Sequence, residues 1–203
     1  QNAIFAVANL FVQAGLNSFD EITVSGAAAA ANADTLVFNM MAAFYTACAS
    51  FVSRNWGAGR NDRIRKSYHI SMLYASIVGA LAGLLLTVFG RQFLGFFADK
   101  PEVIDAGVDR LRIMAFSYFI APLMDCSIAA SRGLGRSVTP TVMVIMGSCV
   151  FRVVWIYTVF AFFHTITSLY LLYIVSWIIT GVAEAIYFRM SYKKYVLERS
   201  MTW

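Results

Sequence analysis

Asp34 lies inside a long apolar stretch of the sequence, where an ionised carboxylate needs a partner or water. Asn32 and Thr35 lie close to it, and Asn39 follows after about one and a half helical turns. Such a cluster can bind a cation or a proton in a polar cavity. It can equally form a structural hydrogen bond to a neighbouring helix, and the sequence leaves both interpretations open.

A second set of polar residues recurs with the period of a helix. Asn9, Gln13 and Asn17 recur every four residues, which places them on one face of a helix. A polar face of this kind cannot face lipid, so it must contact another helix or a cavity. Hydrogen bonds between helices and contact with a substrate are both compatible with the pattern.

Three further charged residues, Asp125, Arg152 and Glu184, lie within apolar stretches. Asp125 follows Pro122 by three residues, and a proline inside a helix kinks it and frees a backbone carbonyl. Arg152 could form an intramembrane ion pair with either of the other two residues or with Asp34. A structural ion pair is the role that we expect for Arg152 and Glu184.

Residue patterns for other chemistries are missing from the sequence. Cys48, Cys126 and Cys149 have no metal-binding spacing, and each lies in an apolar stretch as buried thiols do. His69 and His164 are far from them in the sequence, so we expect no metal site. Because no set of nucleophile and base converges, we predict neither enzyme activity nor a cofactor.

Six apolar segments must position these polar residues. They cover residues 3–19, 26–52, 70–89 with 92–98 continuing it, 108–130, 139–163 and 168–188. A helix needs about 20 residues to cross a bilayer, and no segment alternates as a barrel strand does. The chain is 60% hydrophobic and 13% charged, a balance that suits lipid. We predict an all-α membrane protein, a bundle of six transmembrane helices.

Basic residues are unevenly distributed among the connections. The connections after the second and fourth segments and the C-terminal end contain Arg54, Arg60, Arg63, Arg65, Lys66, Arg132, Arg136, Arg189, Lys193, Lys194 and Arg199. The opposite connections are mostly acidic or neutral, although Arg110 and Arg112 lie near the outer start of the fourth segment. Because basic connections stay cytoplasmic, both ends of the chain are predicted to be cytoplasmic. This bias accounts for the net charge of +5 without a nucleic-acid partner.

Four short motifs occur in order along the chain. They lie at residues 9–13 with 17–19, at 42–44 with 50–59, at 131–135 with Pro140, and at 151–156. In this order they resemble the seventh helix, the eighth helix, the turn after the tenth helix and the eleventh helix of multidrug and toxic compound extrusion (MATE) transporters. Together they make nearly the whole chain similar to one half of such a protein.

The resemblance implies a domain organisation. Residues 1–203 would form the C-terminal six-helix lobe, helices seven to twelve, of a twelve-helix transporter in the cytoplasmic membrane. The chain starts at Gln1 and enters an apolar stretch at once, so we expect the N-terminal lobe to be absent from it. The expected partners are that missing lobe, membrane lipid and a drug-like small molecule.

The resemblance also implies an activity. It indicates a proton- or sodium-coupled antiporter that exports drugs or other lipophilic small molecules, with H⁺ or Na⁺ as the coupling ion. The alternative is a lipid-linked oligosaccharide flippase of the same superfamily, which a basic cavity would favour. Three interior acidic residues against one basic residue, Arg152, favour cationic substrates.

The candidate residues of the substrate and cation pathway are Asp34, Asn9, Gln13, Asn17, Asn39 and Asp125. The resemblance supports Asp34, which matches a position in the eighth helix that is often acidic or polar. Some family members bind a cation with a Glu in helix seven and an Asp in helix ten. The aligned positions here are near Phe5 and Ala121, neither of which can bind a cation.

Overall fold

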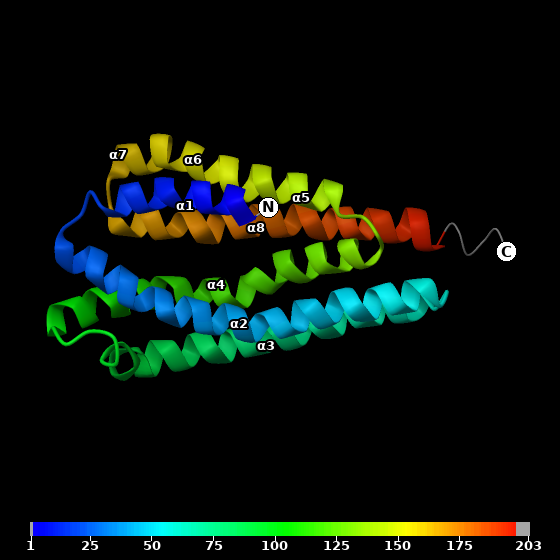
Figure 1. Ribbon diagram of the computed structural model, residues 1–203, viewed down its shortest axis with the longest axis horizontal. Helices are drawn as coiled ribbons and strands as arrows, with labels where there is room; N and C mark the ends of the chain where they lie inside the picture. The colour runs from blue at the N-terminus through cyan, green and yellow to red at the C-terminus, as the bar shows by residue number, and fades with distance from the viewer. Residues whose placement is uncertain (1, 198–203) are drawn as a thin grey trace.

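The chain forms a bundle of long helices (Figure 1), seen in a computed structural model that describes residues 2–197 and the side chains of residues 7–196. The side chain of Phe5 and all of Arg199 lie outside these limits. In chain order the elements are α1 (Asn2–Leu16), α2 (Glu21–Gly57), α3 (Asn61–Leu94), α4 (Pro101–Gly133), α5 (Val138–Val144), η1 (Ile145–Val150), α6 (Phe151–Trp155), η2 (Ile156–Phe160), α7 (Ala161–Phe163), α8 (Ile166–Ser191) and η3 (Tyr192–Leu197).

The six predicted segments are confirmed as helices. Within the described residues, five helical stretches are long and apolar enough to cross a membrane, and α1 adds a shorter apolar helix at Val7–Leu16. The stretch from α5 to α7 is one such crossing, Val138–Phe163. Several helices extend past the predicted limits into polar sequence, since α2 continues to Gly57 and α3 begins at Asn61.

Helix α4 occupies the centre of the bundle. It packs against α2, α3 and α8, and it is the most buried of the membrane-crossing helices. In Figure 1, α1, the α5–α7 stretch and α8 lie together on one side of α4, and α2 and α3 lie on the other. Pro122 lies inside α4, and the α4 ribbon changes direction along its length, as the proline predicts.

Small residues let α2 and α3 approach α4 closely. A Cβ atom added to Gly26 would lie 2.7 Å from the Val103 carbonyl oxygen. A Cβ atom added to Gly83 would lie 2.7 Å from the Ala115 carbonyl oxygen. At these contacts only glycine fits, as is typical where membrane helices pack through their backbones.

The membrane-crossing stretch Val138–Phe163 contains two wide, π-helical turns, η1 and η2. Beside η1, Ser176 of α8 donates a hydrogen bond to the Gly147 carbonyl oxygen at 3.1 Å. Ser148 and Thr180 also form a hydrogen bond between their hydroxyl groups, at 3.3 Å. A π-helical turn changes the direction of the side chains that follow it, and Arg152 is the second residue after η1.

Candidate functional site

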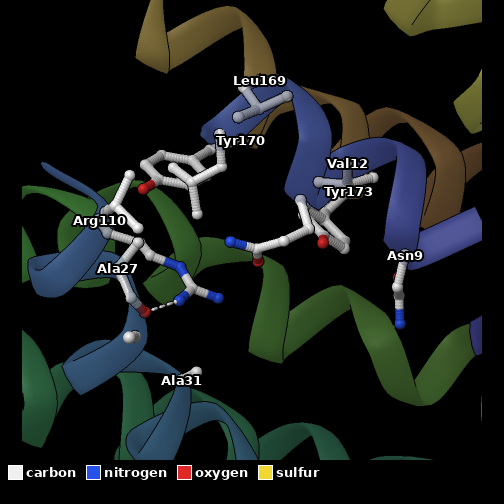
Figure 2. A pocket seen from close by; sticks show the side chains of 12 residues that line it. Asn9, Val12, Ala27, Ala31, Arg110, Leu169, Tyr170 and Tyr173 are labelled. Atoms are coloured by element: carbon white, nitrogen blue, oxygen red, sulfur yellow. Dashed lines mark hydrogen bonds between the residues drawn. The ribbon is translucent and has the colours of Figure 1, made fainter. Parts of the chain in front are cut away.

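A polar cavity lies between α1, α2, α4 and α8 (Figure 2). Its volume is about 240 Å³. Its lining residues are Asn9, Val12, Gln13, Leu16, Val24, Ala27, Ala28, Ala31, Arg110, Leu169, Tyr170 and Tyr173. Alanines on the α2 wall leave room for the longer polar side chains that enter from the three other helices.

Arg110 of α4 is the charged residue in the cavity lining. Its Nη1 atom donates a hydrogen bond to the Ala27 carbonyl oxygen, drawn in Figure 2, and its Nη2 atom forms an ion pair with Asp34. Tyr118 donates a hydrogen bond to the other carboxylate oxygen of Asp34. The side chains of Arg110 and Asp34 are only 12% and 14% exposed. This network joins α2 to α4 and neutralises a carboxylate beneath the cavity.

A second arginine, Arg152, lies against the wall of the same cavity. Its Nη1 atom donates a hydrogen bond to the Asn9 side-chain oxygen at 3.1 Å, and its guanidinium lies 4.6 Å from the centre of the Tyr173 ring. Both of these partners line the cavity. Arg110 similarly lies 5.5 Å from the centre of the Tyr170 ring. Two cation–π contacts therefore hold guanidinium groups at the α8 side of the cavity.

The periodic stripe of α1 is only partly inside this cavity. Asn9 and Gln13 line it, whereas Asn17 does not. Gln13 donates a hydrogen bond to the Asn17 side-chain oxygen at 2.8 Å, within the same helix. The stripe thus satisfies part of its own hydrogen-bonding capacity and presents the remainder to the cavity and to Arg152.

Helix α2 carries an exposed polar stripe, formed by Asn32, Thr35, Asn39, Thr46 and Ser50. The spacing of these residues places them on one face of the helix. The stripe begins beside the cavity, because the cavity-lining Ala28 lies one helical turn before Asn32. We refer to these five residues as the α2 polar stripe. Asn32 donates a hydrogen bond to the Ala29 carbonyl oxygen at 3.1 Å, and Thr35 donates one to the Ala31 carbonyl oxygen at 3.0 Å, so part of the stripe is satisfied within the helix. The amide groups keep further polar atoms that lipid cannot satisfy, which favours water or another protein surface at this face.

Asp125 and Glu184 lie away from the cavity. Asp125 is partly buried on α4, where Tyr45 of α2 and Arg132 interact with its charge. Glu184 is completely buried on α8, and neither of its carboxylate oxygens has a hydrogen-bond partner among the described residues. The structural pairing expected for Arg152 and Glu184 stays a prediction. The π-helical turn η1 precedes Arg152, which lies beside Asn9 of α1.

The main residue that sequence reasoning missed is Arg110. It was assigned to the outer end of the fourth segment, but α4 begins at Pro101, so Arg110 lies about two and a half turns inside the helix. The sequence does contain a signal for this depth, because a proline at the first position of a helix marks where the helix starts. Tyr118, Tyr170 and Tyr173 had no signal that separates them from other aromatic residues.

Comparisons with known proteins agree on one family. The family model described as MatE matches residues 1–158 of this chain. No curated protein matches the chain. Solved structures of transporters do match it, and the chain spans less than half of the length of each one described below.

Three of these structures represent the set. A crystal structure of MATE in the bent conformation has a TM-score of 0.87 at 14% identity, covering 98% of this chain and 44% of that one. An outward-facing multidrug resistance MATE family transporter of the MOP superfamily has a TM-score of 0.82 at 16% identity, covering 95% and 43%. A MOP superfamily transporter from Pyrococcus furiosus Vc1, whose binding pocket is described as having reverse polarity, has a TM-score of 0.85 at 15% identity, covering 94% and 43%.

At these identities the structures establish the fold, which is that of one lobe of a MATE transporter. The family model supplies the sequence evidence, since it matches residues 1–158, well over half of the chain. The motifs at the ends of the first, second and fourth helical segments and within the fifth lie in this matched region. The chain therefore belongs to the MatE family of membrane transporters.

Proposed function

We propose that this chain is the C-terminal lobe of a cation-coupled antiporter that exports drug-like molecules across the cytoplasmic membrane. The observation that carries the proposal is the α2 polar stripe, which continues from the cavity and is exposed on a membrane-crossing helix. A second, N-terminal lobe would cover this stripe and leave a polar path between the lobes. The length of the related structures, of which this chain spans about 43%, supports a partner lobe of similar size.

Asp34 and Arg110 give the proposed mechanism a site in this lobe. Their ion pair holds the guanidinium of Arg110 at the edge of the cavity. A proton or Na⁺ that neutralises Asp34 would weaken its hold on Arg110 and change the charge that a substrate meets. Rocking of the two lobes about the path between them would then expose the site to either side of the membrane in turn.

One observation favours the second candidate, a flippase for lipid-linked oligosaccharides. The charged side chain in the cavity lining is Arg110, and Arg152 lies against the cavity wall. Guanidinium groups bind phosphate through paired hydrogen bonds, and lipid-linked sugars carry phosphate groups. The ion pair with Asp34 offsets one of these positive charges, which keeps a cationic substrate compatible with the site.

The experiment is an export assay with the full-length protein. Cells that express it should accumulate less of a fluorescent lipophilic cation than cells with an empty vector. Collapsing the proton and sodium gradients should abolish this difference, because export would lose its driving force. Equal accumulation in both kinds of cell would contradict export of cations. Gradient-independent movement of a lipid-linked sugar phosphate across proteoliposomes, without cation export, would favour the flippase instead.

A further inference from the structure

Two adjoining cavities lie on the outer surface of the bundle, and they share no lining residue with the polar cavity. The first has a volume of about 610 Å³ and lies between the start of α3 and the end of α8. The second has a volume of about 530 Å³ and lies between α3 and α4. His69 and Met72 line both of them, so the two cavities adjoin along α3.

The first cavity is basic. Arg65, His69, Arg189 and Lys193 line it, and a further neighbouring cavity adds Lys66 and Asp62. Among the residues that the structure describes, the ion pairs of this chain do not involve any of these basic side chains. The positive charges are therefore available for an anionic ligand.

The cavity is held together by contacts between distant parts of the chain. Tyr192 donates a hydrogen bond to the Asn61 carbonyl oxygen at 3.2 Å, and the Asn61 side chain donates one to the Val196 carbonyl oxygen, also at 3.2 Å. Tyr68 of α3 packs on Phe188 of α8 with 4.5 Å between ring centres. These contacts place the basic side chains of α3 opposite those of α8 and η3.

The second cavity is apolar. Apart from His69 and Ser76, its lining consists of Met72, Leu73, Phe119, Ile120 and Leu123. Leu73 and Phe119 are 59% and 52% exposed, so the cavity opens on the surface that faces the bilayer core. From Arg65 to Ser76 the helix rises about 16 Å, which is about half of the hydrocarbon thickness of a bilayer. The pair of cavities thus spans one leaflet, with the charged part at its surface.

We propose that these cavities bind an anionic phospholipid. Its phosphate head group would lie among Arg65, His69, Arg189 and Lys193, and one acyl chain would follow the apolar cavity between α3 and α4. Basic residues at the cytoplasmic ends of membrane helices attract anionic head groups, and this side of the bundle is the one predicted to be cytoplasmic. A bound lipid would join α3, α4 and α8 at the surface, independently of any substrate in the polar cavity.

The test measures lipid binding to the purified full-length protein in detergent by native mass spectrometry. We expect phosphatidylglycerol to bind more tightly than phosphatidylcholine with the same acyl chains. The paired substitution Arg189→Gln and Lys193→Gln should lower this preference about thirtyfold, since each basic residue near an anionic head group contributes about fivefold. The matched control, Arg54→Gln with Arg60→Gln, removes two basic residues of the same predicted side that line none of these cavities and should keep the preference.

Three results would overturn the proposal. The first is that the variant with Arg189→Gln and Lys193→Gln keeps the full preference for phosphatidylglycerol. The second is that the control variant loses as much of this preference, which would indicate an effect of general surface charge. The third is that glycerol phosphate competes with phosphatidylglycerol at equal concentration, which would indicate a site for a free phosphate. Since the assay contains no transport step, a failure to export drugs leaves its outcome unchanged.

Discussion

Replacing Arg110 by methionine is expected to lower the free energy of unfolding by about 3 kcal/mol or more. Asp34 would then be left as a buried carboxylate that keeps only its hydrogen bond from Tyr118. The loss of a buried partner costs far more than the ion pair itself contributes, because the remaining charge stays desolvated. Thermal or denaturant-induced unfolding of the purified protein in detergent measures the effect.

Two control variants separate this effect from the loss of any arginine. Arg112→Met removes a neighbouring arginine whose side chain is 63% exposed, and it should leave stability nearly unchanged. Adding Asp34→Asn to Arg110→Met should recover much of the loss, because it removes the orphaned charge. If Arg110→Met and Arg112→Met destabilise the protein equally, the buried ion pair does not hold α2 to α4.

Replacing Gly79 by alanine is expected to destabilise the protein by about 2 kcal/mol, although alanine favours a helix more than glycine does. The new Cβ atom would collide with the Tyr118 carbonyl oxygen of α4. Met41 of α2 lies on the same side, with its sulfur 3.1 Å from that position. Because backbone cannot move aside as a flexible side chain can, α3 would be pushed away from both helices. The same unfolding assay measures this loss.

Gly57 provides the matched control for this prediction. It lies at the end of α2, and no atom beyond its neighbours along the helix lies within 4 Å of the position that its Cβ atom would take. Gly57→Ala should therefore be neutral or slightly stabilising, since only helix propensity changes. The same substitution, glycine to alanine, is therefore expected to lower the free energy of unfolding at Gly79 but not at Gly57. A Gly79→Ala variant as stable as Gly57→Ala would show that α3 and α4 are not in backbone contact.

The six helices could be predicted from the sequence because apolar segments of about 20 residues have few alternative structures. The helix ends could not be predicted as well. Residues 61–69 of α3 are mostly polar or charged and fall outside the predicted segment, yet they are helical. Hydropathy detects the part of a helix that is inside lipid, whereas these residues form a helix that continues beyond it. The π-helical turns η1 and η2 also have no sequence pattern that predicts them.

The polar cavity was only partly predictable. Periodicity identified Asn9 and Gln13, and the cost of burying a carboxylate identified Asp34. Arg110 was missed because an arginine near the end of a membrane helix normally extends its side chain to the surface. Here the side chain turns inward to Asp34, and only the three-dimensional contact between α2 and α4 reveals it. Whether two charges on different helices meet depends on how each helix is rotated about its own axis, and the hydropathy of a segment does not determine this rotation.

The most direct test of the proposed path is the water accessibility of the α2 polar stripe in the full-length protein. The native thiols of Cys48, Cys126 and Cys149 are buried and should react slowly with a water-soluble thiol reagent. We predict that Asn39→Cys reacts rapidly and that a transported substrate slows the reaction. Leu84→Cys, at an exposed apolar position on α3, should remain unreactive in the membrane. If Asn39→Cys is as unreactive as Leu84→Cys, the stripe faces lipid or packed protein, and the account of a polar path along α2 is wrong.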